Sequence, residues 1–358
     1  MTSRTPVSII TGFLGSGKTT LLNRVLQNPA MAGAAVIINE FGEIGLDHLL
    51  IATPNENTVL LASGCICCTV RGDLVDTLRG LDKQRRNGAL PPFDRVLIET
   101  TGLADPVPII QTVVTDEQLA PRFELDGVLT LVDAVNAMQQ FDTQPEAIKQ
   151  AAVADRLVLT KTDIAPAAEA LLARLARINP GARLLTAHRG EIDASVLFGA
   201  HLNPKAGKDE LARWLPEAAV KQAEMRYTAM HAHDDHIRAH SVYLDDPVSA
   251  NGMTAWLTAL ASLRGANLLR VKGLLNVDGV PVAVHAVQTL IHEPVTLARW
   301  PDADRRSRIV FITREMSRAQ IESTLDVLKL RTTNAAPTPQ PLDPQAYARF
   351  VAAMQKIH

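Results

Sequence analysis

The chain has 358 residues, of which 47% are hydrophobic and 21% charged, so it has room for about two domains and enough apolar residues to build their cores. Its net charge of −2 excludes the basic excess that is typical of a general nucleic-acid-binding protein. No apolar run reaches the ~18 residues that a membrane span requires, and residues 1–6 leave no room for a signal peptide before the first predicted strand. We therefore expect a cytoplasmic protein with neither a membrane nor a nucleic-acid partner.

The first motif is a glycine-rich stretch between an apolar run at 7–10, predicted to be a strand, and a predicted helix over 20–26. It matches the phosphate-loop pattern GxxxxGK[ST] in the strand–turn–helix context that this pattern requires. The alternative is a glycine-rich turn without a ligand. In the phosphate-loop interpretation the glycines let backbone N–H groups point at phosphates, the lysine reaches the β and γ phosphates and the threonine holds Mg²⁺. These residues are Gly12, Gly15, Gly17, Lys18 and Thr19.

A second predicted strand, over 34–38, ends in the polar segment at 39–45. The carboxyl end of a buried strand is where a doubly wound α/β sheet binds its ligands. Glu40 and Glu43 are therefore candidates for contacting Mg²⁺, for positioning water or for ligating a transition metal. Ordinary solvated loop carboxylates are the alternative.

All three cysteines of the chain lie within four positions, after a predicted strand over 58–61 with a turn at 62–64, and before a predicted helix over 73–81. A disulfide framework would distribute its cysteines, so the cluster indicates reduced thiols for metal or redox chemistry. Their place ahead of a helix favours the thiolate form, and closely spaced thiolates suit Zn²⁺ and Cu⁺, with Co²⁺ possible. Redox-active or buried thiols are the alternative. The cysteines are Cys65, Cys67 and Cys68.

A strand predicted over 95–99 carries the second nucleotide motif. It ends in Glu99, three residues before Gly102, as in other phosphate-loop enzymes. Glu99 is expected to hold Mg²⁺ directly or through water, and the Gly102 N–H to meet the γ-phosphate.

The third nucleotide motif follows a strand predicted over 155–159. Thr160, Lys161 and Asp163 resemble the base-reading NKxD motif of GTPases, with threonine where asparagine is usual. Asp163 can accept hydrogen bonds from guanine N1–H and the exocyclic amine, which adenine does not present there, and the Lys161 stem can cover the base.

The order of predicted elements defines the fold class. Predicted strands and helices alternate as far as about residue 200; they include strands over 127–132 and 182–185 and a helix over 166–179. This alternation predicts a doubly wound, mainly parallel sheet of the phosphate-loop NTPase type over 1–200. A polar connector follows over 201–235. A smaller α+β C-terminal domain is predicted over 236–334, with strands at 241–244, 267–275, 280–287 and 308–312, helices at 252–263 and 317–330, and a hairpin turn at Asp278–Gly279. A proline-rich linker and a short helix occupy 335–358.

Four histidines lie close together where the connector ends. Such density is typical of transition-metal binding, although a histidine-rich polar linker is the alternative because the spacing fits no single ligand template. The possible accessory metal ligands are His231, His233, His236 and His240.

Taken together, these motifs resemble the CobW-like GTPases of the CobW/HypB/UreG family, a group associated with metallochaperones. The specific feature is the segment at 64–68, GCxCC, between the phosphate loop and the Glu99 strand; residues 269–273 and 300–307 also resemble the C-terminal domain of this family. The resemblance implies a Mg²⁺-dependent GTPase that binds a divalent transition metal at its cysteines and delivers it to a client metalloprotein, with Zn²⁺ favoured and Co²⁺ or Ni²⁺ open. By position it adds Ser16 and Thr20 to the phosphate-binding residues.

A switch is the hypothesis that joins these parts. The loop of Glu40 and the cysteine loop would adopt one arrangement with Mg²⁺ and GTP and another after the γ-phosphate leaves. Intrinsic hydrolysis is expected to be slow because no candidate base or arginine finger stands out, and the C-terminal domain is expected to serve a client or self-association into a homo-oligomer. The rival interpretations are a metal buffer with a vestigial nucleotide site, a phosphate-loop kinase for a small molecule, and an interaction scaffold.

Overall fold

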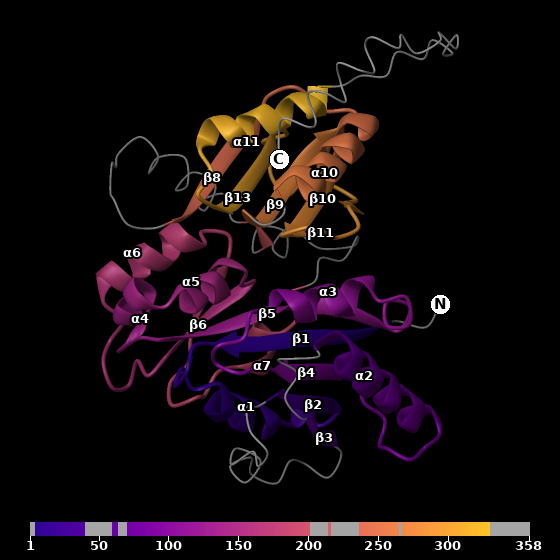
Figure 1. The fold of residues 1–358 in the computed structure, drawn as a ribbon, viewed down its shortest axis with the longest axis vertical. Helices are drawn as coiled ribbons and strands as arrows, with labels where there is room; N and C mark the ends of the chain where they lie inside the picture. The colour runs from indigo at the N-terminus through magenta and orange to yellow at the C-terminus, as the bar shows by residue number, and fades with distance from the viewer. Residues whose placement is uncertain are drawn as a thin grey trace.

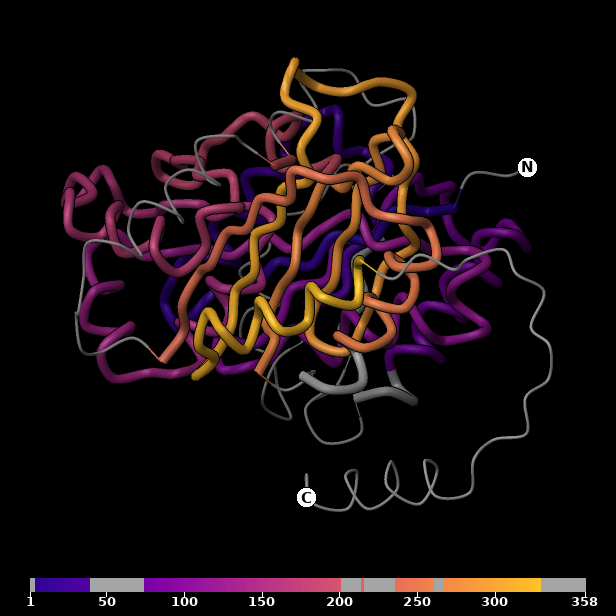
Figure 2. Tube along the Cα trace, turned by 90° about the horizontal axis from the view of Figure 1, so that it is seen from above, coloured from indigo at the N-terminus to yellow at the C-terminus, as the bar shows by residue number. Residues whose placement is uncertain are grey.

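The described part of the chain is built on two β-sheets (Figure 1). The computed structural model describes residues 4–39, 59–63, 70–200, 214–215, 236–264 and 267–329. Seen from above, the C-terminal sheet overlies the N-terminal one (Figure 2). None of the described helices is long and apolar enough to cross a membrane.

The first sheet has seven strands, all parallel, in the order β3-β2-β4-β1-β5-β6-β7. This order places β1, which leads into the phosphate loop, in the middle of the sheet. In chain order the elements are β1 (Thr5–Gly12), α1 (Lys18–Leu26), η1 (Pro29–Met31), β2 (Ala34–Asn39), β3 (Val59–Ser63), α2 (Val70–Arg86), β4 (Arg95–Glu99), α3 (Val107–Thr115), β5 (Phe123–Asp133), α4 (Ala137–Thr143), α5 (Pro145–Ala152), β6 (Arg156–Thr160), α6 (Glu169–Ile178), β7 (Arg183–Thr186) and α7 (Ala194–Leu197).

Helices cover both faces of this sheet because its strands are apolar on both sides. Ile9 of β1 packs with residues of α2 and α3, whereas its neighbour Ile10 packs on the opposite face with residues of α1 and α7. Helices α5 and α6 extend the α2–α3 layer over β5 and β6. The predicted doubly wound, parallel α/β fold is therefore confirmed.

The second sheet has six strands in the order β11-β10-β9-β13-β8, with β12 also paired to β10, and every pairing is antiparallel. Helices α10 and α11 cover one face around Trp256, which is fully buried. The predicted α+β C-terminal unit is confirmed. Its elements are β8 (Ile237–Leu244), α10 (Ala250–Arg264), β9 (Leu268–Val277), β10 (Val280–Val287), β11 (Leu290–Ile291), β12 (Val295–Thr296), β13 (Ser307–Arg314), α11 (Arg318–Leu325) and η3 (Asp326–Lys329).

The predicted hairpin between β9 and β10 is present. Asp278 and Gly279 both have positive φ angles, 50° and 93°, as the tight turn between two antiparallel strands requires. The adjacent turn carbonyl of Gly279 accepts a hydrogen bond from the indole of Trp300 at 3.3 Å.

The two units are joined by a buried ionic cluster, which we call the interdomain joint: Asp155, Arg270 and Lys272. Asp155 precedes β6, while both bases lie on β9. Arg270 forms an ion pair with Asp155 and also donates to the Val153 carbonyl, and Lys272 Nζ lies 3.2 Å from Asp155 Oδ1. Burial raises the pKa of the Asp155 carboxyl, but the two bases outweigh this effect and hold the pKa well below its ordinary range.

Several predicted boundaries were wrong. Strand β5 begins at Phe123 rather than at 127, because its parallel pairing with β1 starts at Thr5 and passes through a bulge. Residues 62 and 63, predicted to be a turn, continue β3 in register with β2. Helix α2 is longer than predicted, α6 begins only at Glu169, and the helix predicted over 317–330 changes to a 3₁₀ helix after Leu325.

Candidate functional site

The phosphate loop has the backbone geometry of an anion cradle. Gly12, Gly15 and Gly17 all have positive φ angles, of 144°, 72° and 89°. A Cβ atom at Gly12 would lie 2.6 Å from the Leu131 carbonyl oxygen, so only glycine fits there. Helix α1 begins at Lys18, directly after Gly17, so its amino-terminal N–H groups open into the loop.

Two further residues assigned to this loop have different environments. Ser16 is 1% exposed, and its hydroxyl oxygen has no hydrogen-bond partner among the described residues. Thr20 lies in the first turn of α1 and is exposed. A buried hydroxyl without a partner inside a glycine-rich loop fits a site that receives polar ligand atoms.

Side chains of β4 and α1 meet beside the loop. Thr19 Oγ1 donates a hydrogen bond to Glu99 Oε1 at 3.0 Å, and Glu99, at the end of β4, is only 5% exposed. Lys18 Nζ donates to the carbonyl of Gly12 at 2.9 Å. A hydroxyl and a carboxylate at hydrogen-bond distance are oxygen ligands of the kind that Mg²⁺ prefers, so these residues fit a magnesium ion.

Gly102 lies directly against the phosphate loop. A Cβ atom at this position would lie 2.6 Å from Leu14 Cδ2 and 2.7 Å from the Leu14 backbone nitrogen. The backbone before it is fastened to β1, because the Thr100 N–H donates to the Ile10 carbonyl at 2.9 Å and its hydroxyl bonds that of Thr11 at 2.8 Å. The strand that carries Glu99 thus brings Gly102 to the edge where phosphates would bind.

The Thr160 hydroxyl joins the third motif to the first. Thr160 Oγ1 donates to the Ser16 carbonyl at 2.8 Å and lies 3.3 Å from the Val132 carbonyl. The residue is 5% exposed. Threonine therefore connects the loop after β6 to the phosphate loop, although asparagine is usual at this position.

Asp133, at the end of β5, holds Lys161 in place. Its carboxylate accepts a hydrogen bond from Lys161 Nζ at 2.7 Å and three more, from the side chain of Asn136 and from the N–H groups of Val135 and Asn136. Burial raises the pKa of Asp133, but these donors together keep it below its ordinary value, so the group is ionised at neutral pH. Lys161 itself has a φ angle of 58°.

Sequence reasoning did not identify Asp133 as a site residue. The available signal was its position directly after the strand predicted over 127–132. The parallel register that pairs Asp133 with Thr160 supplies the missing information.

Asp163 lies at the rim of this edge. Its Oδ2 is 3.9 Å from Arg189 Nε in the loop after β7, and the neighbouring Thr162 hydroxyl lies 3.3 Å from His188 Nδ1. Gly190 packs that loop onto α1, since a Cβ atom there would lie 3.1 Å from Thr20 Cγ2. The residues assigned to the base and to the phosphates therefore lie along one edge of the first sheet.

The predicted transition-metal ligands lie outside the described residues: Glu40, Glu43, Cys65, Cys67, Cys68, His231 and His233. The strands that precede the first five of them are described. Asn39, the last residue of β2, is in register with Ser63, the last of β3, and Ile38 is in register with Glu99. The glutamate and cysteine segments thus begin from neighbouring strand ends, beside the strand of Glu99.

The two described histidines of the accessory cluster have different surroundings. His236 is exposed, with its Nδ1 3.1 Å from Glu315 Oε1. His240 is 5% exposed because β8 begins four residues earlier than predicted, and burial lowers its pKa to about 4. Across residues 4–39, 59–63, 70–200, 214–215, 236–264 and 267–329, no group of three or more His, Cys, Asp or Glu side chains could hold a metal ion.

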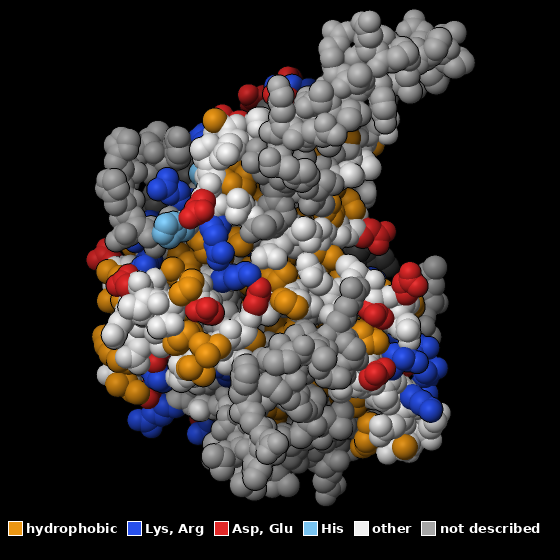
Figure 3. Space-filling view, in the orientation of Figure 1, with side chains coloured by type: hydrophobic (Ala, Val, Ile, Leu, Met, Phe, Trp, Pro, Cys, Tyr) orange, Lys and Arg blue, Asp and Glu red, His pale blue; other side chains and the backbone are white. Residues whose placement is uncertain are grey.

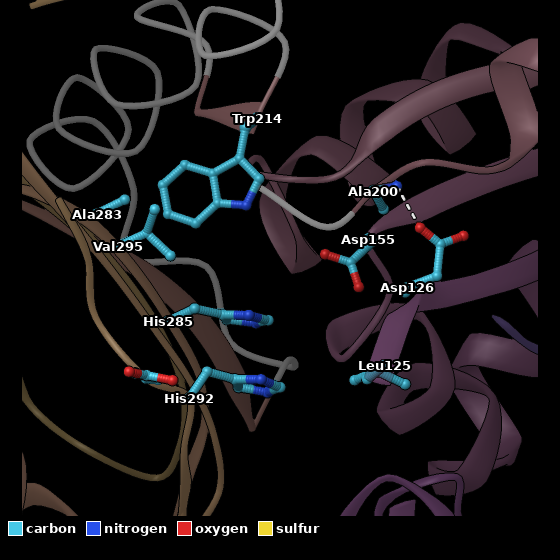
Figure 4. Close-up of a pocket in the computed structure, with 11 residues that line it drawn as sticks. Leu125, Asp126, Asp155, Ala200, Trp214, Ala283, His285, His292 and Val295 are labelled. Carbon is cyan, nitrogen blue, oxygen red and sulfur yellow. Dashed lines mark hydrogen bonds between the residues drawn. The ribbon is translucent and has the colours of Figure 1, made fainter. Parts of the chain in front are cut away.

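A pocket lies between the two units, at the interdomain joint (Figure 4). The rings of His285 and His292 stack at 4.4 Å on its C-terminal side and face Asp155 across it. Asp155 precedes β6, whereas the phosphate loop follows the carboxyl end of β1, so this pocket lies at the other end of the first sheet. The lining residues are Leu125, Asp126, Gly127, Asp155, Ala200, Trp214, Ala283, His285, His292, Glu293 and Val295.

Apolar side chains are exposed around the nucleotide edge. They follow four neighbouring strands, β4, β1, β5 and β6, and are between 46% and 70% exposed. These exposed apolar residues are Leu103, Leu14, Val135 and Ile164.

On the face shown in Figure 3, basic and acidic side chains are interspersed rather than gathered in one patch.

Comparison with known proteins gives matches over most of the chain. Residues 6–186 match the family model of the CobW/HypB/UreG nucleotide-binding domain, and residues 237–329 match that of the cobalamin synthesis protein cobW C-terminal domain. The chain is 37% identical to the zinc chaperone YjiA of Escherichia coli (strain K12), over 90% of this chain and 98% of YjiA. It is 30% identical to the zinc chaperone CobW of Pseudomonas aeruginosa, over 90% of this chain and 91% of that protein.

A solved structure gives the same picture. The crystal structure of Zn(II)-bound YjiA GTPase from E. coli matches with a TM-score of 0.68 and 33% sequence identity, over 92% of this chain and 100% of the YjiA chain. The likeness therefore extends over both sheets.

Proposed function

The chain belongs to the CobW/HypB/UreG family, and we propose that it is a Mg²⁺-dependent GTPase that carries a divalent transition metal and delivers it to a client metalloprotein. The proposed GTPase activity rests on one observation: the three nucleotide motifs meet at one edge of the parallel sheet. The Thr160 hydroxyl bonds the Ser16 carbonyl, the Thr19 hydroxyl bonds Glu99, and Gly102 lies against Leu14.

Each residue at this edge has a proposed role in GTP hydrolysis. Lys18 turns from the Gly12 carbonyl to the β and γ phosphates, and the Gly102 N–H meets the γ-phosphate. Thr19 and Glu99 hold Mg²⁺, which when bound neutralises charge that develops on the phosphate oxygens. The site positions groups and stabilises charge, and with no arginine finger assigned to it we expect slow intrinsic turnover.

Guanine selection is assigned to the loop after β6. Asp163 accepts the two guanine donors that adenine lacks, while Lys161, fastened to Asp133 at 2.7 Å, presents its stem to the base. The Thr160 bond to the Ser16 carbonyl supports this assignment, because it ties base recognition to phosphate recognition.

The metal cargo is assigned to Cys65, Cys67 and Cys68, with Glu40 and Glu43 as further ligands. Thiolates are soft ligands that suit Zn²⁺, with Co²⁺ and Ni²⁺ as alternatives. Two kinds of observation support this assignment: the relatives named as zinc chaperones, and the adjacent strand ends at Asn39, Ser63 and Glu99. Metal affinity would then depend on the nucleotide state.

Reciprocity sets the size of this coupling. If GTP changes metal affinity tenfold, the metal changes GTP affinity by the same factor, which corresponds to about 1.4 kcal/mol. The client is proposed to bind the C-terminal unit.

The test is a comparison of Zn²⁺ and Co²⁺ affinity of the reduced protein in Mg²⁺-GTP and in Mg²⁺-GDP. A difference that disappears in Cys67→Ala and in Lys18→Ala would support a nucleotide-gated carrier. Equal affinities in both nucleotides, together with hydrolysis that metal does not alter, would identify a buffer or a structural metal instead. Phosphate transfer to an acceptor other than water, surviving in Cys67→Ala, would identify a kinase.

A further inference from the structure

Helix α5 supplies a second support for the loop that carries Gly102. Gln150, on α5, is 1% exposed and lies beneath this loop. Its side-chain Nε2 donates to the Gly102 carbonyl at 3.1 Å and to the Ala104 carbonyl at 3.0 Å. Both hydrogens of the amide are thereby used on one loop of the candidate nucleotide site.

The orientation of this amide is determined by its partners. Two carbonyl oxygens require donors, so the nitrogen must face them, and the Oε1 atom is left without a hydrogen-bond partner among the described residues. The buried amide of Asn179 also leaves its oxygen without a partner among the described residues, so what distinguishes Gln150 is the pair of bonds that it donates to the loop of Gly102.

Gln150 is itself held in place. Its backbone carbonyl accepts a hydrogen bond from Thr130 Oγ1 of β5 at 2.8 Å, which fixes this turn of α5 on the central sheet. The preceding residue, Lys149, forms an ion pair with Asp105 at 2.5 Å, and Asp105 also accepts from the Val107 N–H at the start of α3. The Lys149 pair is partly exposed and contributes little, so the buried Gln150 amide is the stronger of the two restraints that α5 supplies.

We propose that Gln150 is a positioning residue for GTP recognition, which holds the loop at Gly102 against the phosphate loop so that GTP is distinguished from GDP. The Gly102 carbonyl lies in the planar peptide group that follows the Gly102 Cα, and the Thr100 N–H is bonded to β1 before it, so the peptide group that carries the Gly102 N–H is restrained from both ends. A loop that must meet the γ-phosphate then needs no reordering when GTP binds. This inference rests on the proposed function, because it takes Gly102 as the γ-phosphate contact.

The chain offers a matched control in Asn179. Its side-chain amide is also buried, 2% exposed, and Nδ2 donates to the carbonyls of Ala151, Ala152 and Ala154 near the end of α5. It thus makes bonds of the same chemistry to the same region but none of these bonds reaches the loop of Gly102. A merely structural role would make the two amides equivalent.

The test measures dissociation constants of mant-GTP and mant-GDP with Mg²⁺, together with kcat and KM for GTP, in the full-length protein and in Gln150→Met and Asn179→Leu. For Gln150→Met we expect GTP affinity to fall about tenfold and GDP affinity less than about twofold, because the removed bonds act on the loop that meets the γ-phosphate. Asn179→Leu should lower the thermal midpoint comparably and leave the GTP-to-GDP affinity ratio at its wild-type value.

A second variant keeps the test decisive if Gln150→Met does not fold. Gln150→Glu has the same shape, but as a carboxylate it repels both carbonyls, whereas its protonated form can donate to one of them. Its GTP-to-GDP affinity ratio should therefore recover toward the wild-type ratio as the pH is lowered from 8 to 6. Wild-type ratios in both Gln150 variants, alongside normal wild-type GTP hydrolysis, would overturn this inference alone. A wild-type protein that binds no Mg²⁺-GTP would overturn the proposed function as well.

Discussion

The nucleotide edge and the interdomain joint use the same kinds of side chain in opposite ways. At the nucleotide edge, Lys18 rests on a backbone carbonyl and Thr19 on a carboxylate, both of which are partners that a ligand can replace. At the joint, Asp155 is paired with two bases that are 2% and 4% exposed. The difference teaches that polar and charged side chains can bind a ligand where the ligand can replace their present partners. Where those partners are buried and cannot be replaced, the same kinds of side chain stabilise the fold.

The largest expected effect is at the joint. Asp155→Asn would leave Arg270 and Lys272 buried without a counter-charge, and removing one partner of a buried ion pair typically costs about 3–5 kcal/mol. Urea unfolding would measure this loss. The control is Asp304→Asn, whose partner Arg306 is half-exposed, and about 0–1 kcal/mol is expected there. Equal losses of unfolding free energy in the two variants would contradict the expected difference between buried and exposed ion pairs.

The second effect concerns pH and His240. Burial lowers the pKa of His240 to about 4, and Arg238 and Arg318 add to the effect. The unfolded chain binds a proton below about pH 6.5 and the folded chain only near pH 4, so acidification favours unfolding within this range. We expect this group to remove up to about 1.4 kcal/mol of unfolding free energy per pH unit.

The measurement is the slope of unfolding free energy between pH 6.5 and 4.5. His240→Gln should reduce the slope. An unchanged slope in His240→Gln would mean that His240 is not the titrating group.

The third effect tests the nucleotide edge through Gly102. In Gly102→Ala the new methyl group would overlap Leu14, including its backbone, and overpacking of this kind costs about 1–3 kcal/mol. Because the strain falls on the phosphate loop, GTP affinity should fall about tenfold or more, as measured by mant-GTP titration. Gly80→Ala is the control, since it lies inside α2 with its nearest neighbour at 4.0 Å, and should slightly stabilise the protein. Wild-type GTP affinity in Gly102→Ala would contradict the assigned contact.

The smallest effect is expected for the Thr160 hydroxyl. Thr160→Val keeps the shape but removes the bond to the Ser16 carbonyl, at a cost of about 1–2 kcal/mol. GTP affinity and stability should both decrease, because the base loop loses its bond to the phosphate loop. Thr112→Val, which removes a buried threonine bond within α3, should reduce stability alone. If both variants reduce stability and neither reduces GTP affinity, the Thr160 hydroxyl has a structural role alone.

The sequence by itself predicted the features that depend on neighbouring residues. The strand–loop–helix of the phosphate loop, the end of β4 at Glu99 and the hairpin at Asp278–Gly279 were all correct. Each depends on local backbone preferences, such as the positive φ angles that glycine adopts, and these are encoded within a few residues. Periodic apolar runs likewise sufficed to predict the two sheets.

Tertiary structure alone decided which side chains meet. The side chain of Lys161 bonds Asp133, which lies 28 positions away in the sequence. Gln150 bonds Gly102 across 48 positions, and Arg270 bonds Asp155 across 115 positions. No local pattern specifies such pairs, because strand order and register determine which strand ends become neighbours. The burial of His240 has the same origin: β8 was extended through a polar, histidine-rich stretch by its pairing with β13, and long-range pairing outweighed local composition.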